Sequence, residues 1–197
     1  MRKTDPELHA RRRREILEAA EGCFIKSGFH GASMGDIATA AGVSMGLLYR
    51  YFANKEAIIE SFAAQDSAAT IAAIEDWAEA KAALPAFRVL SHRLIDEAMQ
   101  PERAAIVAEI YAESLRNTKL RKLLARYEAM ITKAWAEAIT RHRASGTLQP
   151  GTAPEIIADL LLAAIDGYSG RRLLSAKRLP TAELEAVLDE LTRLIGA

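Results

Sequence analysis

Residues 31–56 read GASMGDIATAAGVSMGLLYRYFANKE, and this stretch decides the fold. Ser33 and Asp36 stand three positions apart, which is a variant of the capping box and predicts a helix that begins near Ser33. Gly42 ends that helix after two turns, because glycine readily takes the left-handed conformation that follows many helices. Ser44 is a favourable N-cap and predicts a second short helix. Two short helices joined by a tight glycine turn form a helix-turn-helix.

The second short helix is expected to bury one face and to expose the other. Leu48 and Phe52 lie one helical turn apart, so both side chains are expected to face the core. A short helix that is exposed on its other side can enter the major groove of DNA. There Arg50 can donate two hydrogen bonds to a guanine edge, and Met45 or Leu47 can contact a thymine methyl group. Further candidates are Gly46, where the backbone can approach closely, and Tyr49, Tyr51 and Lys55, which suit phosphate contacts.

The rest of the chain also favours helix. Alanine makes up about a fifth of the residues, and leucine, glutamate, arginine and isoleucine fill much of the remainder. Most of these are good helix formers, and no strict alternation of apolar and polar residues is long enough for a strand. The glycine and proline positions divide the chain, so we expect an all-α fold of about nine helices. The expected ranges are about 7–26, 33–41, 44–52, 55–83, 86–99, 102–116, 119–144, 154–175 and 181–195.

The chain has 197 residues and a single cysteine, Cys23. One thiol makes neither an internal disulfide nor a zinc cluster, so Cys23 is expected to be a small core residue in a reducing compartment. No apolar run approaches the roughly 20 residues that span a bilayer. The N-terminus also lacks the apolar stretch of a signal peptide. We therefore expect a cytoplasmic protein with no membrane partner.

Charge is balanced over the chain but not locally. Lysine and arginine number 26, as do aspartate and glutamate, so the total charge gives no sign of a nucleic-acid partner. Residues 1–14 nevertheless carry six basic groups, which are Arg2, Lys3 and the run Arg11 to Arg14. Four successive arginines point all round a helix. At least one of them is a candidate phosphate contact, and the alternative is that the run is simply solvated.

The sequence offers no pattern typical of an enzyme or a metal site. The four histidines are scattered at His9, His30, His92 and His142. There is no metal-ligand spacing, no glycine-rich phosphate loop and no nucleophile elbow. Glu109 and Glu113 stand one turn apart and could form a carboxylate pair, although a solvated helix face is the simpler interpretation. We therefore expect no catalytic residue, no metal, no cofactor and no enzymatic activity.

The motifs of residues 31–56 resemble the DNA-binding domain of the tetracycline-repressor (TetR) family. The markers are Asp36-Ile37-Ala38, Ala41-Gly42-Val43-Ser44, Gly46, Leu48-Tyr49, Tyr51-Phe52 and Asn54-Lys55-Glu56. The resemblance is ungapped, extends over about residues 10–62 and follows a first helix that opens the chain. The remaining two thirds resemble the family only in being helical and of similar length.

The resemblance implies a homodimer that represses transcription from a palindromic operator in double-stranded DNA. It also implies that a small-molecule effector releases the DNA. The expected domains are a three-helix helix-turn-helix domain over residues 1–54 and a helical effector-binding and dimerisation domain over residues 55–197. Position by position, Ser33, Tyr49, Tyr51 and Lys55 match family positions that touch the DNA backbone. Met45, Gly46, Leu47 and Arg50 match positions that choose the sequence, and Ser44 completes the expected DNA-contact set.

Two positions depart from the common family pattern. Position 45 is often lysine and is Met45 here, and position 47 is often threonine or serine and is Leu47 here. Direct readout then depends on Arg50, Tyr49 and apolar contacts. We therefore expect modest base discrimination in each half-site.

The C-terminal two thirds are expected to hold the effector and the second subunit. Candidate effector-pocket residues are Phe62, Gln65, Phe87, Met99, Tyr111, Ser114, Trp135, Asp166 and Tyr168, since such a pocket is apolar with a few polar groups. The resemblance implies that the last two helices pack against their copies, with Ile157, Leu161, Leu184, Val187, Leu188, Leu191 and Ile195 as candidate interface residues. Asp166 interrupts an apolar face, so it could bind a cationic or hydroxylated ligand, pair with an arginine, or face solvent. The candidate arginine partners are Arg93, Arg171 and Arg172.

Two other functions stay open at this point. The chain could be a helical enzyme or small-molecule-binding protein whose helix-turn-helix is purely structural. It could also be a regulator that has no effector and acts through protein contacts. DNA binding separates the first of these from a regulator, and a ligand that changes DNA affinity excludes the second.

Overall fold

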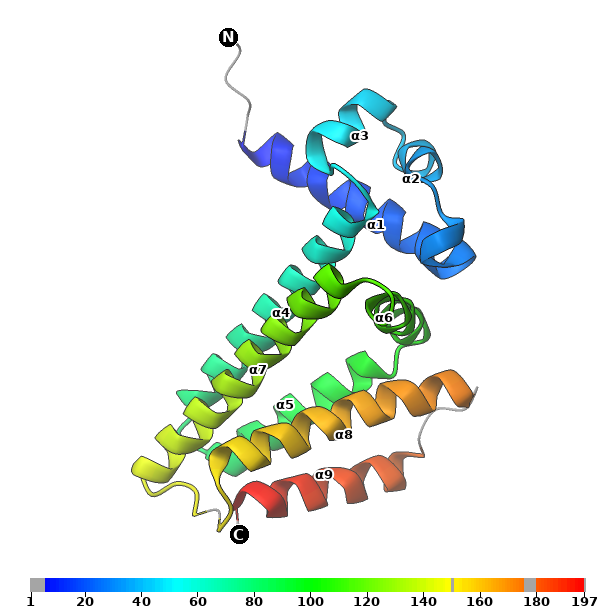
Figure 1. Ribbon diagram of the computed structural model, residues 1–197. Coiled ribbons are helices and arrows are strands. Elements are labelled where there is room, and N and C mark those ends of the chain that lie inside the picture. Colours follow the sequence, from blue (N-terminus) through cyan, green and yellow to red (C-terminus); the bar gives the residue numbers. More distant parts are fainter. Residues whose placement is uncertain (1–5, 150, 176–179, 197) are drawn as a thin grey trace. The chain divides into compact units, whose positions relative to one another are not determined.

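The computed structural model describes residues 6–149, 151–175 and 180–196 (Figure 1). Within these ranges the regular structure consists of nine helices and no strand. The helices are α1 (Pro6–Gly31), α2 (Met34–Ala40), α3 (Met45–Tyr51), α4 (Lys55–Ala78), α5 (Ala83–Ala98), α6 (Pro101–Ser114), α7 (Thr118–Ala144), α8 (Pro154–Leu174) and α9 (Thr181–Gly196). The expected all-α fold of about nine helices is therefore confirmed.

The helices pack as two compact units, which we call unit 1 and unit 2. Unit 1 contains the chain up to Ala64 together with Ala105–Leu123, and unit 2 contains Gln65–Ala104 together with the chain from Leu124 onward. Helices α4, α6 and α7 each contribute residues to both units. The functional division expected after residue 54 stays a prediction. Unit 1 is larger than the expected N-terminal domain, because it also contains the start of α4 and parts of α6 and α7.

The core of unit 1 follows the apolar spacing of α1. Ile16, Ala20 and Phe24 recur at helical spacing, and each is almost completely buried. The Phe24 ring packs 5.6 Å from the Phe29 ring and edge-on to the Phe62 ring at 6.5 Å, measured between ring centres. Each fully buried large side chain contributes about 1.5–3 kcal/mol to folding. This apolar stripe therefore anchors α1 in unit 1.

Cys23 completes the expected stripe of α1 but is only half-buried. Burial, and then the negative charge of Asp36, raise the pKa of its thiol. A raised pKa keeps the thiol protonated at neutral pH, and the protonated form is a poor nucleophile. The expectation of a core residue is therefore met only in part, since Cys23 lies at the edge of the core.

Gly28 interrupts α1 as expected, because its φ of 71° and ψ of 167° are not helical, and the helical turn that continues to Gly31 follows this kink. One other helix boundary differs from the expected one. Helix α4 ends at Ala78, and α5 begins at Ala83, two residues before Pro85. Proline is tolerated in the first turn of a helix, because the N–H that it lacks has no partner there. Pro85 therefore lies inside the first turn of α5 and does not mark the break.

Unit 2 is built around an aromatic cluster. The Trp77 ring of α4 lies 5.4 Å from the rings of Phe87 in α5 and Trp135 in α7. The indole N–H of Trp77 donates to the carbonyl of Ala83 at 2.9 Å. The buried His142 ring packs 4.7 Å from Trp77, and its Nε2 lies 3.0 Å from the Trp77 carbonyl oxygen. The cluster thereby ties α4, α5 and α7 together.

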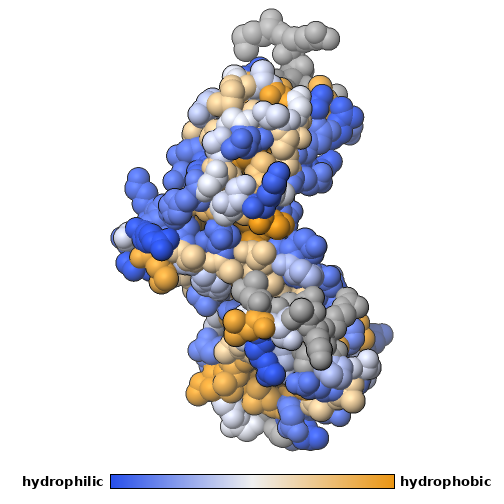
Figure 2. All heavy atoms as spheres, turned by 90° about the vertical axis from the view of Figure 1, so that its right-hand side faces the viewer, coloured by the Kyte–Doolittle hydropathy of each residue, from blue (hydrophilic) through white to orange (hydrophobic). Residues whose placement is uncertain are grey.

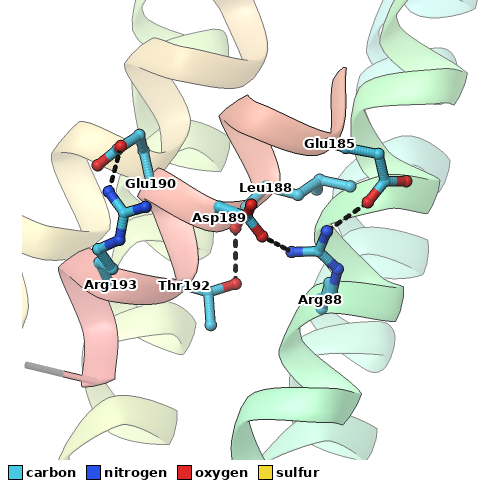
Figure 3. A network of polar contacts seen from close by, with 7 residues as sticks. All are labelled: Arg88, Glu185, Leu188, Asp189, Glu190, Thr192 and Arg193. Atoms are coloured by element: carbon cyan, nitrogen blue, oxygen red, sulfur yellow. Dashed lines mark hydrogen bonds and ion pairs between the residues drawn. The ribbon is translucent and has the colours of Figure 1, made fainter. Parts of the chain in front are cut away.

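The last two helices pack onto α5. Helix α5 contacts both α8 and α9, and α8 and α9 lie side by side (Figure 1). Polar contacts join α5 to α9, where Arg88 donates to Asp189 at 2.6 Å and also to Glu185 (Figure 3). Asp189, and then Glu185, raise the pKa of the Arg88 guanidinium. Exposed ion pairs of this kind contribute little to stability, so apolar burial holds these helices in place.

Hydrophilic residues cover most of the face shown in Figure 2, and hydrophobic residues gather there in small patches. Scattered exposed apolar residues are normal on a folded protein, whereas a continuous exposed stripe needs an explanation. Among the described helices, none is long and apolar enough to cross a membrane.

Candidate nucleic-acid interface

A reciprocal capping box fixes the first turn of α2. The N–H of Asp36 donates to Ser33 Oγ at 3.1 Å, and the N–H of Ser33 donates to the Asp36 carboxylate at 2.9 Å. The Ser33 hydroxyl donates to the same carboxylate at 2.6 Å. The side-chain bond, and then the backbone bond, from Ser33 lower the pKa of Asp36. The predicted capping box is confirmed, and it engages the Ser33 hydroxyl that was expected to touch phosphate.

The turn before α3 and the buried side of α3 follow from local sequence. Gly42 has a φ of 63°, which lies in the left-handed region. Ser44 caps α3, because its Oγ accepts a hydrogen bond from the N–H of Leu47 at 3.2 Å. Leu48 and Phe52 are 0% and 2% exposed. The core-facing side expected for this helix is therefore confirmed.

The opposite side of α3 is open to solvent. Met45 is 42% exposed, Tyr49 is 52% exposed, and Gly46 and Arg50 are exposed beside them. No atom lies within 4 Å of the position that a Cβ on Gly46 would take, so another molecule can approach the backbone there. Leu47 is half-buried and offers less of its side chain. This face carries a cation, a phenol and apolar atoms, which are groups that contact base edges and phosphates.

Two predicted phosphate contacts have partners inside unit 1. The half-buried Tyr51 ring lies 4.6 Å from the His9 ring. Lys55 Nζ donates to the carbonyls of Ala32, at 2.8 Å, and Phe29, and it lies 4.5 Å from the centre of the Phe29 ring. An ammonium group has three N–H donors. Lys55 therefore uses two of these donors to hold residues 29 and 32, and its predicted phosphate contact stays a prediction.

The basic run near the N-terminus is divided between internal contacts and exposure. Arg11 and Arg12 lie 3.6 Å and 2.7 Å from carboxylate oxygens of Glu15. Arg13 has contacts within unit 1, and Arg14 is exposed. Arg2 and Lys3 lie outside the described residues. The run therefore does not act as one uniform basic patch.

Two carboxylates of α6 lie against residues 29 and 30, which follow the kink at Gly28. The N–H of Phe29 donates to Glu109 Oε2 at 2.8 Å, across a sequence separation of 80 residues. Nε2 of His30 lies 2.7 Å from Glu113 Oε2, and Glu113 is 7% exposed. The solvated helix face expected for these glutamates is therefore wrong. No local signal could have revealed the contacts, because their partners are distant in sequence.

Comparison with known proteins identifies the family. Residues 16–62 match the family model described as bacterial regulatory proteins, tetR family. Residues 87–196, more than half of the chain, match the model for the C-terminal part of BetI-type transcriptional repressors. This chain belongs to the TetR family. It is a DNA-binding transcriptional regulator, with α2 and α3 as its helix-turn-helix.

Individual relatives of this TetR-family chain agree with the family models. The chain is 31% identical to the HTH-type transcriptional regulator UidR of Escherichia coli over 150 residues. These residues cover 76% of this chain and 76% of UidR. It is 26% identical over 180 residues to the HTH-type transcriptional repressor AcnR of Corynebacterium efficiens, covering 90% of this chain and 88% of AcnR. The structure of Salmonella enterica GusR superposes with a TM-score of 0.80 and 26% identity over 99% of each chain.

Four of the residues expected to line the effector pocket of this TetR-family regulator lie in or against the core of unit 2. They are Phe87, Met99, Trp135 and Tyr168. Trp135 is 1% exposed, and its indole N–H has no hydrogen-bond partner among the described residues. The structure therefore brings these four into one packed region.

The other pocket candidates, Asp166 apart, are not part of this core. Phe62, Tyr111 and Ser114 belong to unit 1, where Ser114 donates to the Tyr111 carbonyl at 2.7 Å. Gln65 belongs to unit 2 and is exposed. That all these residues line one pocket stays a prediction.

Asp166 lines a groove between α7 and α8 with a volume of about 1000 Å³. Alanine and leucine side chains give the groove apolar surface, and carboxylates including Glu128 and Asp159 border it. Of the arginines considered as partners for Asp166, Arg93 lies beside Glu97 and Arg171 beside Glu183, and the side chain of Arg172 lies outside the described part of the chain. In the ranges that the structure describes, no group of three or more His, Cys, Asp or Glu could hold a metal ion.

The seven residues expected at the dimer interface point into the subunit instead. Ile157, Leu161, Leu188, Leu191 and Ile195 are buried in the core of unit 2, and Leu184 and Val187 are partly buried against it. Helices α8 and α9 have apolar residues on more than one face, and the sequence alone did not show which face meets the subunit's own core. The structure therefore corrects this assignment and leaves the other face of α8 exposed.

Proposed function

We propose that two copies of this chain form a repressor that binds a palindromic operator and releases it when a small molecule binds unit 2. The main observation behind the proposal is the exposed face of α3. The opposite face of this helix is buried, and Ser44 caps its N-terminus. One short recognition helix contacts few base pairs. Two helices related by a twofold axis contact half-sites about one helical turn, or 34–36 Å, apart.

Different exposed residues of α3 contact the bases and the phosphates in this proposal. Arg50 supplies the bidentate donor for a guanine, and Met45 supplies apolar contact to a thymine methyl group. Tyr49 and the remaining donor of Lys55 contact phosphates and set the position of the helix along the groove. Since a single long donor reads the bases, recognition of each half-site is modest, and the dimer supplies the rest of the specificity.

The exposed face of α8 supports the second subunit. Its apolar and small residues follow a spacing of four and three positions, which keeps them in one line on a helix: Ile156, Leu160, Ala163, Gly167, Gly170 and Leu174. We call this line the α8 stripe. Leu160 is 48% exposed and Leu174 is 91% exposed. In the part of the chain that the structure describes, no atom of another residue meets the position that a Cβ on Gly167 or Gly170 would take, so a second helix can approach closely.

The groove between α7 and α8 supports an effector site in unit 2. It combines apolar surface with a few polar groups, which is typical of small-molecule sites, and it contains Asp166. The proposal includes no catalytic residue and no cofactor. It also includes a location in the cytoplasm, where a transcriptional regulator meets its DNA.

The proposal is tested by incubating the full chain with a pool of random-sequence DNA duplexes and sequencing the retained molecules. We expect enrichment of a palindrome whose half-sites lie one helical turn apart. The enriched duplex then serves to screen small molecules for release. A folded dimer that enriches no sequence at either low or moderate salt contradicts the proposal and favours a purely structural helix-turn-helix.

A further inference from the structure

Three elements of unit 1 meet at Arg13. Arg13 lies on α1, and its guanidinium carbon sits 5.1 Å from the centre of the Phe52 ring, the residue that ends α3. Its Nη2 donates to Ser61 Oγ on α4 at 2.5 Å. One side chain therefore connects the first helix, the end of the recognition helix and the start of the long helix that follows it.

Both partners of Arg13 are held in place. Phe52 is 2% exposed, and its N–H donates to the carbonyl of Leu48 at 2.9 Å, which closes α3. Ser61 is buried, and its hydroxyl donates to the carbonyl of Ala57 at 2.9 Å while its oxygen accepts from Arg13. A planar guanidinium can lie over a ring and donate from its edge at the same time, and a lysine at this position keeps the charge but lacks the planar fork of donors.

The neighbours of Arg13 in the basic run make a natural comparison. Arg11 and Arg12 pair with Glu15 on the same helix. Arg14 is exposed. Residues 13 and 14 carry the same charge at adjacent positions, but only the first of them has its guanidinium placed against α3 and α4.

We propose that Arg13 is a positioning residue that orients α3 for base recognition and does not itself bind phosphate. The proposal rests on the proposed operator binding, and it concerns how that binding acquires sequence preference. A small rotation of α3 displaces its base-contacting atoms while leaving nonspecific phosphate contacts largely intact. Loss of Arg13 is therefore expected to affect specific binding more than nonspecific binding.

The first test needs no DNA. Amide hydrogen exchange of the full chain is measured for the wild type and for Arg13→Lys, Arg13→Gln and Arg14→Gln. We expect the amides of residues 47–52 to exchange faster in both Arg13 variants and at the wild-type rate in Arg14→Gln. Unchanged exchange in the Arg13 variants overturns the proposal, even if no operator is found.

The second test uses the selected operator and a scrambled duplex of equal length over a series of salt concentrations. Both Arg13 variants are expected to bind the operator about tenfold or more weakly, with unchanged affinity for the scrambled duplex and an unchanged salt slope. Arg14→Gln is the matched control for the loss of one positive charge, and any loss of affinity that it causes should fall on both duplexes alike.

Two results of this second test contradict the proposal. In the first, Arg13→Lys binds both duplexes like the wild type, whereas Arg13→Gln binds both more weakly and with a smaller salt slope. Arg13 would then bind phosphate through its charge. If the variants only melt at lower temperature and the folded protein binds both duplexes normally, the role of Arg13 is purely structural. Ser61→Ala removes the acceptor without changing charge, and it should reproduce a milder loss on the operator alone.

Discussion

At the residue scale, Lys55 shows that a basic side chain predicted to bind phosphate can also have partners inside the fold. Its Nζ donates to the backbone carbonyls of Phe29 and Ala32, which uses two of its three N–H donors. Arg50, by contrast, is exposed on α3. Substitution of these two residues should therefore have different consequences.

Arg50→Ala should cost about 1–3 kcal/mol of operator binding and relax the sequence preference at one position in each half-site. The physical reason is the loss of a bidentate donor to a guanine edge.

Lys55→Ala should instead weaken binding to all sequences alike and also lower the thermal stability, because the carbonyls of Phe29 and Ala32 lose their donor. Competition assays on operator and scrambled duplexes measure both effects. Equal losses on the two duplexes for Arg50→Ala would exclude a base-reading role.

The capping box of α2 predicts a pH dependence. Hydrogen bonds from Ser33 lower the pKa of Asp36 in the folded state, so the folded carboxylate resists protonation more than the unfolded one. The resulting stabilisation is present above the ordinary carboxyl pKa of about 4 and is lost as the pH falls through the lower folded value. Asp36→Asn should therefore flatten the decline of Tm between about pH 5 and pH 3. An unchanged pH profile in thermal melts would contradict this assignment.

At the scale of elements, the turn from Gly28 to Ser33 is where local and distant contacts combine. Gly28 has a left-handed φ, and Lys55 donates hydrogen bonds to two carbonyls of this turn. Glu109 accepts a hydrogen bond from the N–H of Phe29. The carboxylate oxygen of Glu109 lies 3.1 Å from the position that a Cβ on Gly28 would take. Helix α2 follows directly, so its start depends on a helix that comes 70 or so residues later.

Gly28→Ala should destabilise the protein by about 1–2 kcal/mol, because a non-glycine residue is strained at this φ and its Cβ crowds Glu109. Gly22→Ala is the matched control in the same helix. No atom lies within 4 Å of the Cβ position at Gly22, so alanine there should stabilise by about 0.5–1 kcal/mol. Urea unfolding of both variants measures the difference. Equal stabilities for the two variants would show that the kink at Gly28 is not required.

At the scale of the whole molecule, the α8 stripe is a line of exposed apolar and small residues that a second subunit could cover. Its members are apolar or small, and they follow one line along the exposed side of α8. A charged residue in the middle of this line has no partner once a second helix covers it. The stripe therefore predicts which substitutions separate the subunits.

Leu160→Glu should raise the Kd of the dimer by about a hundredfold or more, because an unpaired carboxylate is buried on association. Loss of the dimer should also abolish binding to a two-half-site operator at concentrations that saturate the wild type. Val89→Glu is the control, since Val89 is 71% exposed on α5 and lies outside the stripe. Sedimentation of both variants measures the oligomeric state. A dimer that tolerates Leu160→Glu would place the interface on another surface.

The helix-turn-helix was determined by the sequence itself, because its signals are local. Ser33 with Asp36, the turn at Gly42 and the cap at Ser44 each act over three or four residues, and the structure contains all of them. The buried side of α3 could equally be predicted from the sequence, since Leu48 and Phe52 lie one turn apart. Most helix boundaries followed from glycine and proline, and Pro85 misled only because proline also fits the first turn of a helix.

Only the tertiary structure decided the partners of polar side chains and the direction of helices with two apolar faces. Lys55 and Arg13 looked like phosphate ligands, yet both donate to groups in unit 1, and Glu109 and Glu113 looked solvated. A charge does not reveal in its own sequence whether water, phosphate or a distant carbonyl will meet it. In the same way, Ile157 and Leu161 occupy one apolar face of α8 and Ile156 and Leu160 another. Which face is buried depends on where α5 and α9 pack, and those contacts join residues that are far apart in the chain.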